Sequence, residues 1–220
     1  MQRLDLGGGA RRSLAEAPGG RGGTWSADGV ILFASNSGGP LSRVAAAGGS
    51  VVPVPTLDRH TSHRFPTFLP DGRHFLFYAQ GGPDTSGIFL GALDAKTQTR
   101  LTAADTAGTY LPGAPGRADS GGDGGFVPWV RGSMLVAQRL DLAETALTGD
   151  PVPLADPVRT DAGLMHSAVS VSATGLVAYR SGESRRQLTW RDRTGKVLGT
   201  RGPRMRMVYL LPMWPRTAAA

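Results

Sequence analysis

The stretch FLPDGRHFLFYA (residues 68–79) decides the fold. A Pro-Asp-Gly turn leads directly into a run of apolar and aromatic residues, which is the pattern of a tight turn followed by a buried strand. The pair Asp71-Gly72 predicts a type I′ hairpin turn, which needs positive φ at both of its central residues. One such stretch predicts a single hairpin, so the fold depends on whether the pattern recurs.

The same order of turn and strand recurs in TWSADGVILFAS (residues 24–35) and in SVSATGLVAYRS (residues 170–181). The turn glycines Gly29 and Gly72 are 43 residues apart, and Gly175 follows 103 residues later, which is about two further units. A weaker third copy places Gly125 at the turn position. Each unit continues with an alternating strand and a last short strand. Four strands in each unit of this length predict a β-propeller blade.

The sequence therefore predicts an all-β fold: a partial β-propeller of about four blades, each a four-stranded antiparallel sheet. The 32 glycines and 16 prolines make up about 22% of the chain, against a usual share of roughly 12%, and this excess favours many short strands over long helices. An atypical tail follows at 203–220. The incomplete propeller is predicted over 1–202, in units of about 1–20, 21–62, 63–106, 107–163 and 164–202.

The net charge of +7 raises the question of a nucleic-acid partner. Lysine supplies two of the 24 cations, and the arginines are scattered along the chain, so we predict no nucleic-acid binding. The absence of cysteine excludes disulfides, thiolate metal sites and a cysteine nucleophile. No apolar window of membrane-spanning length and no signal-peptide core is found in this sequence. The local arginine clusters are Arg11-Arg12, Arg185-Arg186 and Arg201, Arg204 and Arg206.

The units WSADGVILF and FLPDGRHFLF resemble the WD40-like (PD40) repeat of TolB-type propellers. Together with TSHRFPTFLPDGRHFLFY, SGIFLGALD and VSATGLVAYRSG, they are most similar to the C-terminal propeller region of bacterial serine/threonine protein kinase-like proteins. The resemblance covers about residues 2–202. It implies a periplasmic or otherwise extracytoplasmic propeller of six or more blades, so we expect this chain to be a fragment. The tail indicates a truncated or frame-shifted gene product, and open blade edges would favour self-association.

The sequence lacks the motifs of the enzymes that accompany such propellers. No glycine-rich kinase loop, strand lysine, catalytic-loop aspartate or Asp-Phe-Gly is found, and no Gly-x-Ser-x-Gly elbow of a hydrolase. GGGARR and GGRGG lack the ending of a phosphate loop. ADSGGDGG superficially resembles a serine-protease segment, with Ser120 as nucleophile and His60 or His74 as base, but an inter-strand loop explains it better. We predict no catalytic residue and no cofactor.

The segment RHTSHRF places His60 and His63 three residues apart, and His74 follows the next turn. These histidines could share a divalent metal with Asp58 or Asp71. A histidine at the entry to an inner strand more often forms hydrogen bonds with loop carbonyls, so we predict no metal site. The aromatic residues are expected to pack between blades. They are Trp25, Phe33, Phe68, Phe75, Phe77, Tyr179 and Trp190.

Three functional hypotheses follow. The first is a non-catalytic binding or scaffold module in a TolB-like or kinase-associated sensory context, whose partner is a protein, a peptide or a component of the cell envelope. The second is a fragment of a serine/threonine protein kinase or propeller-bearing peptidase whose catalytic domain lies outside this chain. The third is a propeller enzyme with a metal in its channel, which would need inward carboxylates and histidines from several blades.

Overall fold

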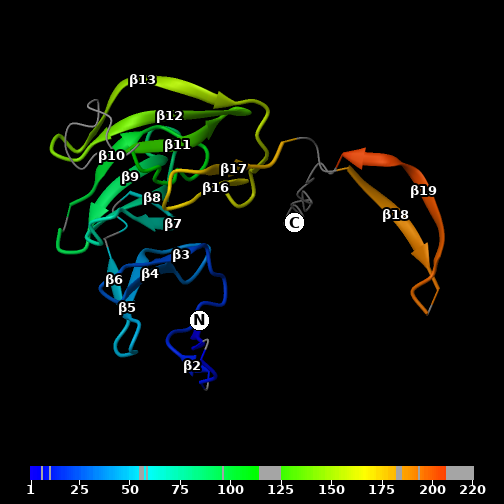
Figure 1. Cartoon of the computed structure of the whole chain (residues 1–220), viewed down its shortest axis with the longest axis horizontal. Helices are drawn as coiled ribbons and strands as arrows, with labels where there is room; N and C mark the ends of the chain where they lie inside the picture. The colour runs from blue at the N-terminus through cyan, green and yellow to red at the C-terminus, as the bar shows by residue number, and fades with distance from the viewer. Residues whose placement is uncertain are drawn as a thin grey trace, which may run out of the picture. The chain divides into compact units, whose positions relative to one another are not determined.

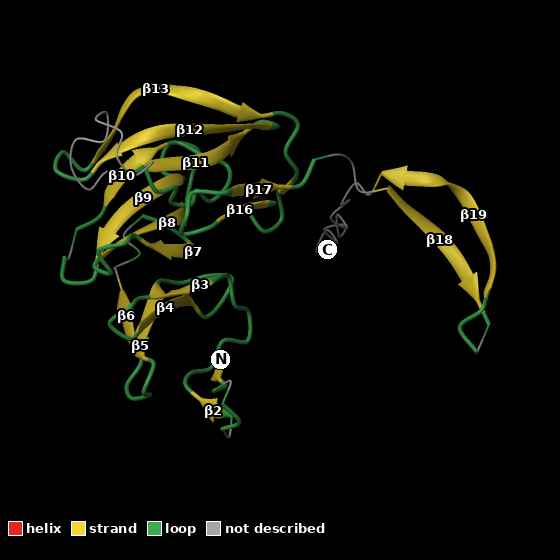
Figure 2. Ribbon diagram, in the orientation of Figure 1, coloured by secondary structure: helices red, strands yellow, loops and turns green. Residues whose placement is uncertain are grey.

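The computed structural model describes residues 1–5, 7–9, 11–54, 57, 59–95, 97–113, 125–181, 185–192 and 194–206. The chain divides into two compact units, Met1–Ser181 and Gly182–Ala220, which are described separately. In the described residues the regular structure is β-strand (Figures 1 and 2), and no helix there has the length and hydropathy of a membrane span. The prediction of an all-β partial propeller is confirmed.

Two four-stranded antiparallel sheets form the centre of the first unit. In each sheet, every strand pairs with its neighbour in sequence, which is the meander of a propeller blade. The first sheet contains β3 (Gly23–Trp25), β4 (Val30–Ala34), β5 (Leu41–Ala45) and β6 (Val52–Val54). The second contains β7 (Ser62–Phe68), β8 (His74–Gln80), β9 (Gly87–Ala92) and β10 (Thr99–Thr102).

The third sheet has three strands, in the order β11-β12-β13. An irregular segment lies along its inner edge, because Leu111 and Phe126 exchange both backbone hydrogen bonds at 2.8 Å and the Thr109 amide donates to the Pro128 carbonyl at 3.1 Å. This segment therefore takes the place of an innermost strand, and Gly125 directly precedes the strand that follows. The regular strands are β11 (Phe126–Arg131), β12 (Met134–Asp141) and β13 (Ala146–Ala155).

The remaining strands form two-stranded hairpins. In the first unit these are β1–β2, β14–β15 and β16–β17, and the second unit contains β18–β19. The predicted blade over 164–202 thus corresponds to strands of both units, and its assembly into one sheet stays a prediction. The bounds are β1 (Gln2–Arg3), β2 (Arg12–Ser13), β14 (Thr160–Asp161), β15 (His166–Ser167), β16 (Val169–Val171), β17 (Val177–Tyr179), β18 (Arg185–Arg191) and β19 (Val197–Arg206).

The turn at Asp71-Gly72 differs in type from the prediction. Gly72 has a φ of 66°, but Asp71 is absent from the described residues with positive φ, so the turn is not type I′. The Gly72 amide donates to the Leu69 carbonyl at 3.0 Å, which makes Pro70 and Asp71 the central residues of a type I turn and Gly72 its last residue. Pro70 explains why the turn is centred one residue earlier than predicted, because its φ near −65° suits the first central position of a type I turn.

The core lies between adjacent sheets and uses both faces of β8. Phe75, Phe77 and Ala79 pack against the first sheet, while Leu76 packs against the third. The continuous apolar run of β8 is therefore explained by burial on both sides, as expected of an inner-blade strand. The hairpin β1–β2 leads to Leu14, which packs on the opposite face of the first sheet.

The aromatic residues behave in two ways. Phe33, Phe75 and Phe77 are buried and Phe68 packs against the core, as predicted. The expectation of inter-blade packing was wrong for Trp25 and Tyr179, which are 56% and 50% exposed. Tyr179 belongs to a two-stranded sheet, and Trp25 ends a three-residue strand. Trp190 belongs to the second unit, so its packing between blades stays a prediction. Trp25 and Tyr179 both lie on edge strands of their sheets.

Candidate functional site

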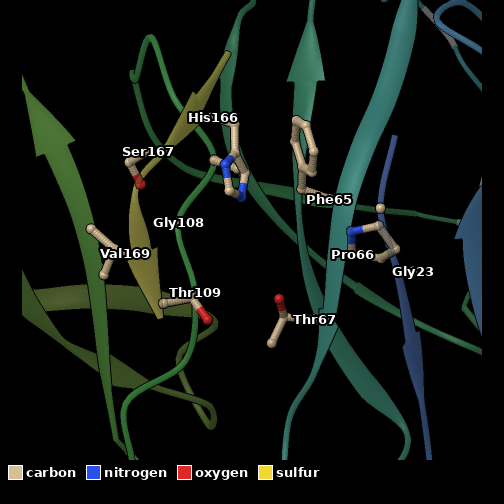
Figure 3. A pocket seen from close by; sticks show the side chains of 11 residues that line it. Gly23, Phe65, Pro66, Thr67, Gly108, Thr109, His166, Ser167 and Val169 are labelled. Carbon is tan, nitrogen blue, oxygen red and sulfur yellow. The ribbon is translucent and has the colours of Figure 1, made fainter. Parts of the chain in front are cut away.

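A cavity of about 220 Å³ lies where the inner strands of successive sheets converge (Figure 3). Its walls come from the start of β3, the middle of β7, the irregular segment before β11, and β15 and β16. This is the position of the central channel in a propeller. The lining residues are Gly22, Gly23, Phe65, Pro66, Thr67, Ala107, Gly108, Thr109, His166, Ser167 and Val169.

Backbone irregularity shapes the wall formed by β7. The pairing of β7 with β8 shifts between Arg64 and Thr67, and Phe65 has a φ of 50°, which is unusual for a bulky residue. Gly22 makes the close approach to this bulge possible, because a Cβ there would lie 2.9 Å from the Phe65 Cα. The Phe65 amide donates to the Arg21 carbonyl at 2.7 Å, so the bulge is tied to the preceding sheet.

The cavity presents hydroxyl groups and one imidazole. Figure 3 shows Thr67 and Thr109 on facing walls and the His166 ring beside Phe65, with the two ring centroids 4.6 Å apart. Burial lowers the pKa of His166, and the nearby Asp161 carboxylate opposes that shift. Burial therefore favours the neutral form of the imidazole. Such a lining can accept and donate hydrogen bonds, but it contains no carboxylate and no nucleophile paired with a base.

A buried guanidinium belongs to the residue that precedes Phe65 of the cavity wall. Arg64, which is 7% exposed, donates from Nε to the Ser62 hydroxyl at 2.8 Å and from Nη2 to the Ser37 carbonyl at 2.8 Å. Nη2 also donates to Gln80 Oε1 at 2.5 Å, and Nη1 lies 3.3 Å from the Met165 sulfur. Arg64 thus connects the first two sheets with the segment that precedes β15.

The structure separates the histidines that sequence analysis grouped together. His60 Nδ1 and His63 Nε2 lie 3.4 Å apart, and the His63 ring packs on Phe77 with centroids 4.7 Å apart. His74 instead pairs with Asp71 at 2.5 Å. In the β7–β8 ladder His63 lies opposite Ala79, which is five residues from His74 along β8. That separation is about 17 Å along the strand, so one metal ion cannot bind both pairs.

The buried imidazole of His63 has an unpaired nitrogen. Its side chain is fully buried, and Nδ1 has no hydrogen-bond partner. Desolvation is the larger cause and the charge of His60 the smaller, and together they lower the pKa of His63 to about 4. A proton on Nε2, donated to His60, is the favoured tautomer because it leaves an acceptor rather than a donor unsatisfied.

Two of the residues considered as candidates lie outside the described residues. They are Ser120, the protease-like nucleophile, and Asp58, a proposed metal ligand. Within the described residues no group of three or more histidines and carboxylates is placed to hold a metal ion. The prediction of no catalytic and no metal residue stays a prediction.

The sequence analysis did not single out the cavity residues. A signal was present in the segment HRFPTF, where a charged residue and a proline interrupt an apolar strand. Such interruptions mark bulges, where a side chain is redirected or a ladder ends. The contributions of Thr109 and His166 could not be found this way, because they come from other units of the chain.

The fold is that of a TolB-like β-propeller, of which the described residues form part. Its fold is similar to that of TolB from Acinetobacter baumannii, with a TM-score of 0.55 and 21% identity over 89% of this chain and 47% of that one. The hydrazine synthase of Kuenenia stuttgartiensis is similar with a TM-score of 0.48 and 17% identity, over 86% of this chain and 50% of that one. The chain therefore spans about half the length of these structures.

No protein-family model matches the sequence, and a comparison with curated protein sequences finds no similar protein.

Proposed function

We propose that this chain is a non-catalytic propeller module that binds a polypeptide partner at the inner-strand cavity. The cavity at the convergence of the inner strands is the observation that carries the proposal. Its volume of about 220 Å³ lies below the 300–1,000 Å³ that is usual for a cofactor or drug-sized ligand. It suits one side chain of a partner, with adjoining backbone on the rim.

The lining supports binding rather than chemistry. Thr67, Thr109 and Ser167 supply hydroxyls that can donate to or accept from a peptide backbone. The rings of His166 and Phe65, tilted by 44° to each other, supply faces against which an aliphatic or aromatic side chain can pack. These features act on shape and hydrogen bonding, and none of them activates a nucleophile.

The wider setting is proposed from the resemblance in the sequence. A TolB-like or kinase-associated sensory protein would present this module outside the cytoplasm, with six blades in the intact propeller. The alternative is that the chain is part of a serine/threonine kinase or a propeller-bearing peptidase. Self-association is supported by the two-stranded sheet β16–β17, where Leu176 is 73% exposed and Tyr179 is half exposed.

Selection from a displayed library of random peptides tests the binding proposal. Thr109→Trp fills the cavity, whereas Glu144→Trp adds the same side chain to an exposed turn and serves as the matched control. We expect enriched peptides to bind the wild type and Glu144→Trp equally and to bind Thr109→Trp at least about tenfold more weakly. Circular dichroism melting establishes that both variants fold. Equal binding to all three proteins, or no enrichment at all, overturns the proposal.

A further inference from the structure

Arg64 is a buried cation whose hydrogen-bond acceptors are all uncharged. They are a hydroxyl, a backbone carbonyl, a side-chain amide oxygen and a thioether sulfur, contributed by Ser62, Ser37, Gln80 and Met165. A guanidinium has five N–H groups, and a thioether is a weak acceptor, so the Nη1 side of Arg64 is incompletely satisfied. Removing a charge from water without a counter-ion is costly, which makes an anion at this position favourable.

Arg21 carries a second guanidinium, and its loop adjoins the loop that contains Ser37. Arg21 Nη1 donates to the carbonyls of Gly19 and Gly20 at 3.0 and 3.1 Å, and its buried Nε has no partner. The Gly19 amide donates to the Ser35 carbonyl at 3.2 Å, which joins this loop to the one that receives Arg64. Burial, and then the charge of Arg21, lower the pKa of Arg64, in agreement with two cations close to each other.

Neither arginine is neutralised by the described part of the protein. The ion pairs found there are Arg3–Asp5, Arg73–Asp94 and Asp71–His74, so no described carboxylate lies within 4.0 Å of Arg21 or Arg64. The neighbours of the two arginines in sequence, Gly22 and Phe65, line the cavity. The backbone positions next to both arginines therefore belong to the cavity wall.

We propose that Arg21 and Arg64 form a carboxylate-binding subsite beside the cavity, and that it receives an acidic side chain or C-terminal carboxylate of the partner. The assignment of the carboxylate to a polypeptide rests on the proposed function. Planar guanidinium groups match the geometry of a carboxylate and can bind it through paired hydrogen bonds. The net charge of +7 also favours the approach of an acidic segment.

Sodium acetate is the probe for the subsite itself. In a ¹⁵N spectrum of the arginine Nε–H groups, acetate added at constant ionic strength against sodium chloride should shift the Arg21 and Arg64 signals in a saturable way. Arg43 provides an internal control, because its Nη1 also donates to a backbone carbonyl, that of Leu93 at 3.3 Å. Arg21→Gln, at a partly exposed position, should weaken acetate binding about tenfold, and Arg21→Lys should restore part of it.

The outcomes separate this proposal from the proposed function. Equal shifts with acetate and chloride, an equal shift of Arg43, or unchanged affinity in Arg21→Gln overturns the subsite. Acetate binding should persist in Thr109→Trp, so a failure of peptide selection leaves this measurement intact. If peptides are enriched, replacing their acidic residue by its amide should weaken binding to the wild type but not to Arg21→Gln. Equal loss on both proteins contradicts a polypeptide source for the carboxylate.

Discussion

The sheet β7–β10 and the sheet β16–β17 start from the same kind of turn. Gly72 and Gly175 both have positive φ, and each donates its amide to the carbonyl three residues earlier. The strands that follow these turns differ in burial. Phe77 in β8 is fully buried, whereas Tyr179 in β17 is half exposed. The turn is therefore specified locally, while burial requires a sheet on each side of the strand.

The comparison also indicates that the sheet β7–β10 contributes more to the stability of the first unit than the sheet β16–β17 does. β8 has paired strands on both edges and packed sheets on both faces, whereas β17 has one pairing partner in the described residues. An isolated two-stranded sheet is marginally stable in water. Changes in the sheet β7–β10 should therefore affect global unfolding, and changes in the sheet β16–β17 should affect local opening.

The largest contrast is expected from truncating an aromatic side chain in each sheet. Phe77→Ala removes a ring that contacts Phe75, Phe89 and His63, with centroids 5.8, 5.7 and 4.7 Å away. It should lower the free energy of unfolding by about 3–5 kcal/mol. Tyr179→Ala should lower it by under about 1 kcal/mol. Urea unfolding monitored by tryptophan fluorescence measures both, and similar losses would contradict the difference in packing.

A second test uses pH, because the buried sheet contains a buried titratable group. The pKa of His63 is lowered from 6.5 to about 4, so the unfolded chain binds a proton between these values that the folded chain does not. Stability is therefore complete above about pH 6.5 and falls as the pH drops toward 4. The loss attributable to His63 is about 3 kcal/mol.

The variant His63→Leu isolates this effect. Urea midpoints measured between pH 7 and pH 4 should fall less steeply in His63→Leu than in the wild type. His166→Leu is the comparison from the hairpin region, because burial also lowers the pKa of His166, but this residue is exposed and its loss should change the slope less. An unchanged slope in His63→Leu would show that His63 is not the group that destabilises the protein in mild acid.

Much of the fold could be predicted because it depends on short-range patterns. A turn glycine followed by an apolar run appears in the printed sequence, and the spacing of Gly29, Gly72 and Gly175 gives the repeat. The error over turn type was avoidable, because proline is favoured as the first central residue of a type I turn, which centres the turn on Pro70 and Asp71. The exposure of Tyr179 was harder to predict, since the sequence pattern around it is the same as that of a buried strand.

The candidate site depends on contacts between distant segments. Phe65 and His166 are about 100 residues apart in sequence, yet their rings are in contact. The positive φ of Phe65 results from a bulge that is held by the preceding sheet, and no residue preference predicts it. The unpaired charges of Arg21 and Arg64 are also a property of the assembled loops, because a list of arginines does not show which ones have acidic neighbours.

The smallest contrast concerns the turns themselves. Gly72→Val forces a β-branched residue to a φ of 66°, although the nearest atom to its Cβ, Asp28 Oδ2, would lie at an ordinary 3.4 Å. The cost is therefore backbone strain of about 1–2 kcal/mol, which should shift the urea midpoint of the whole unit. Arg73→Ala removes an exposed ion pair with Asp94 and should shift it less.

Gly175→Val imposes similar strain at a φ of 85°, but the hairpin β16–β17 can release that strain by opening alone. We therefore expect faster amide exchange at Leu176, whose N–H donates to the Ser172 hydroxyl at 3.0 Å, with little change in the urea midpoint. Hydrogen exchange followed by NMR distinguishes the two variants. If Gly175→Val shifts the midpoint as much as Gly72→Val, the hairpin unfolds together with the sheets, and the proposed difference in local stability is wrong.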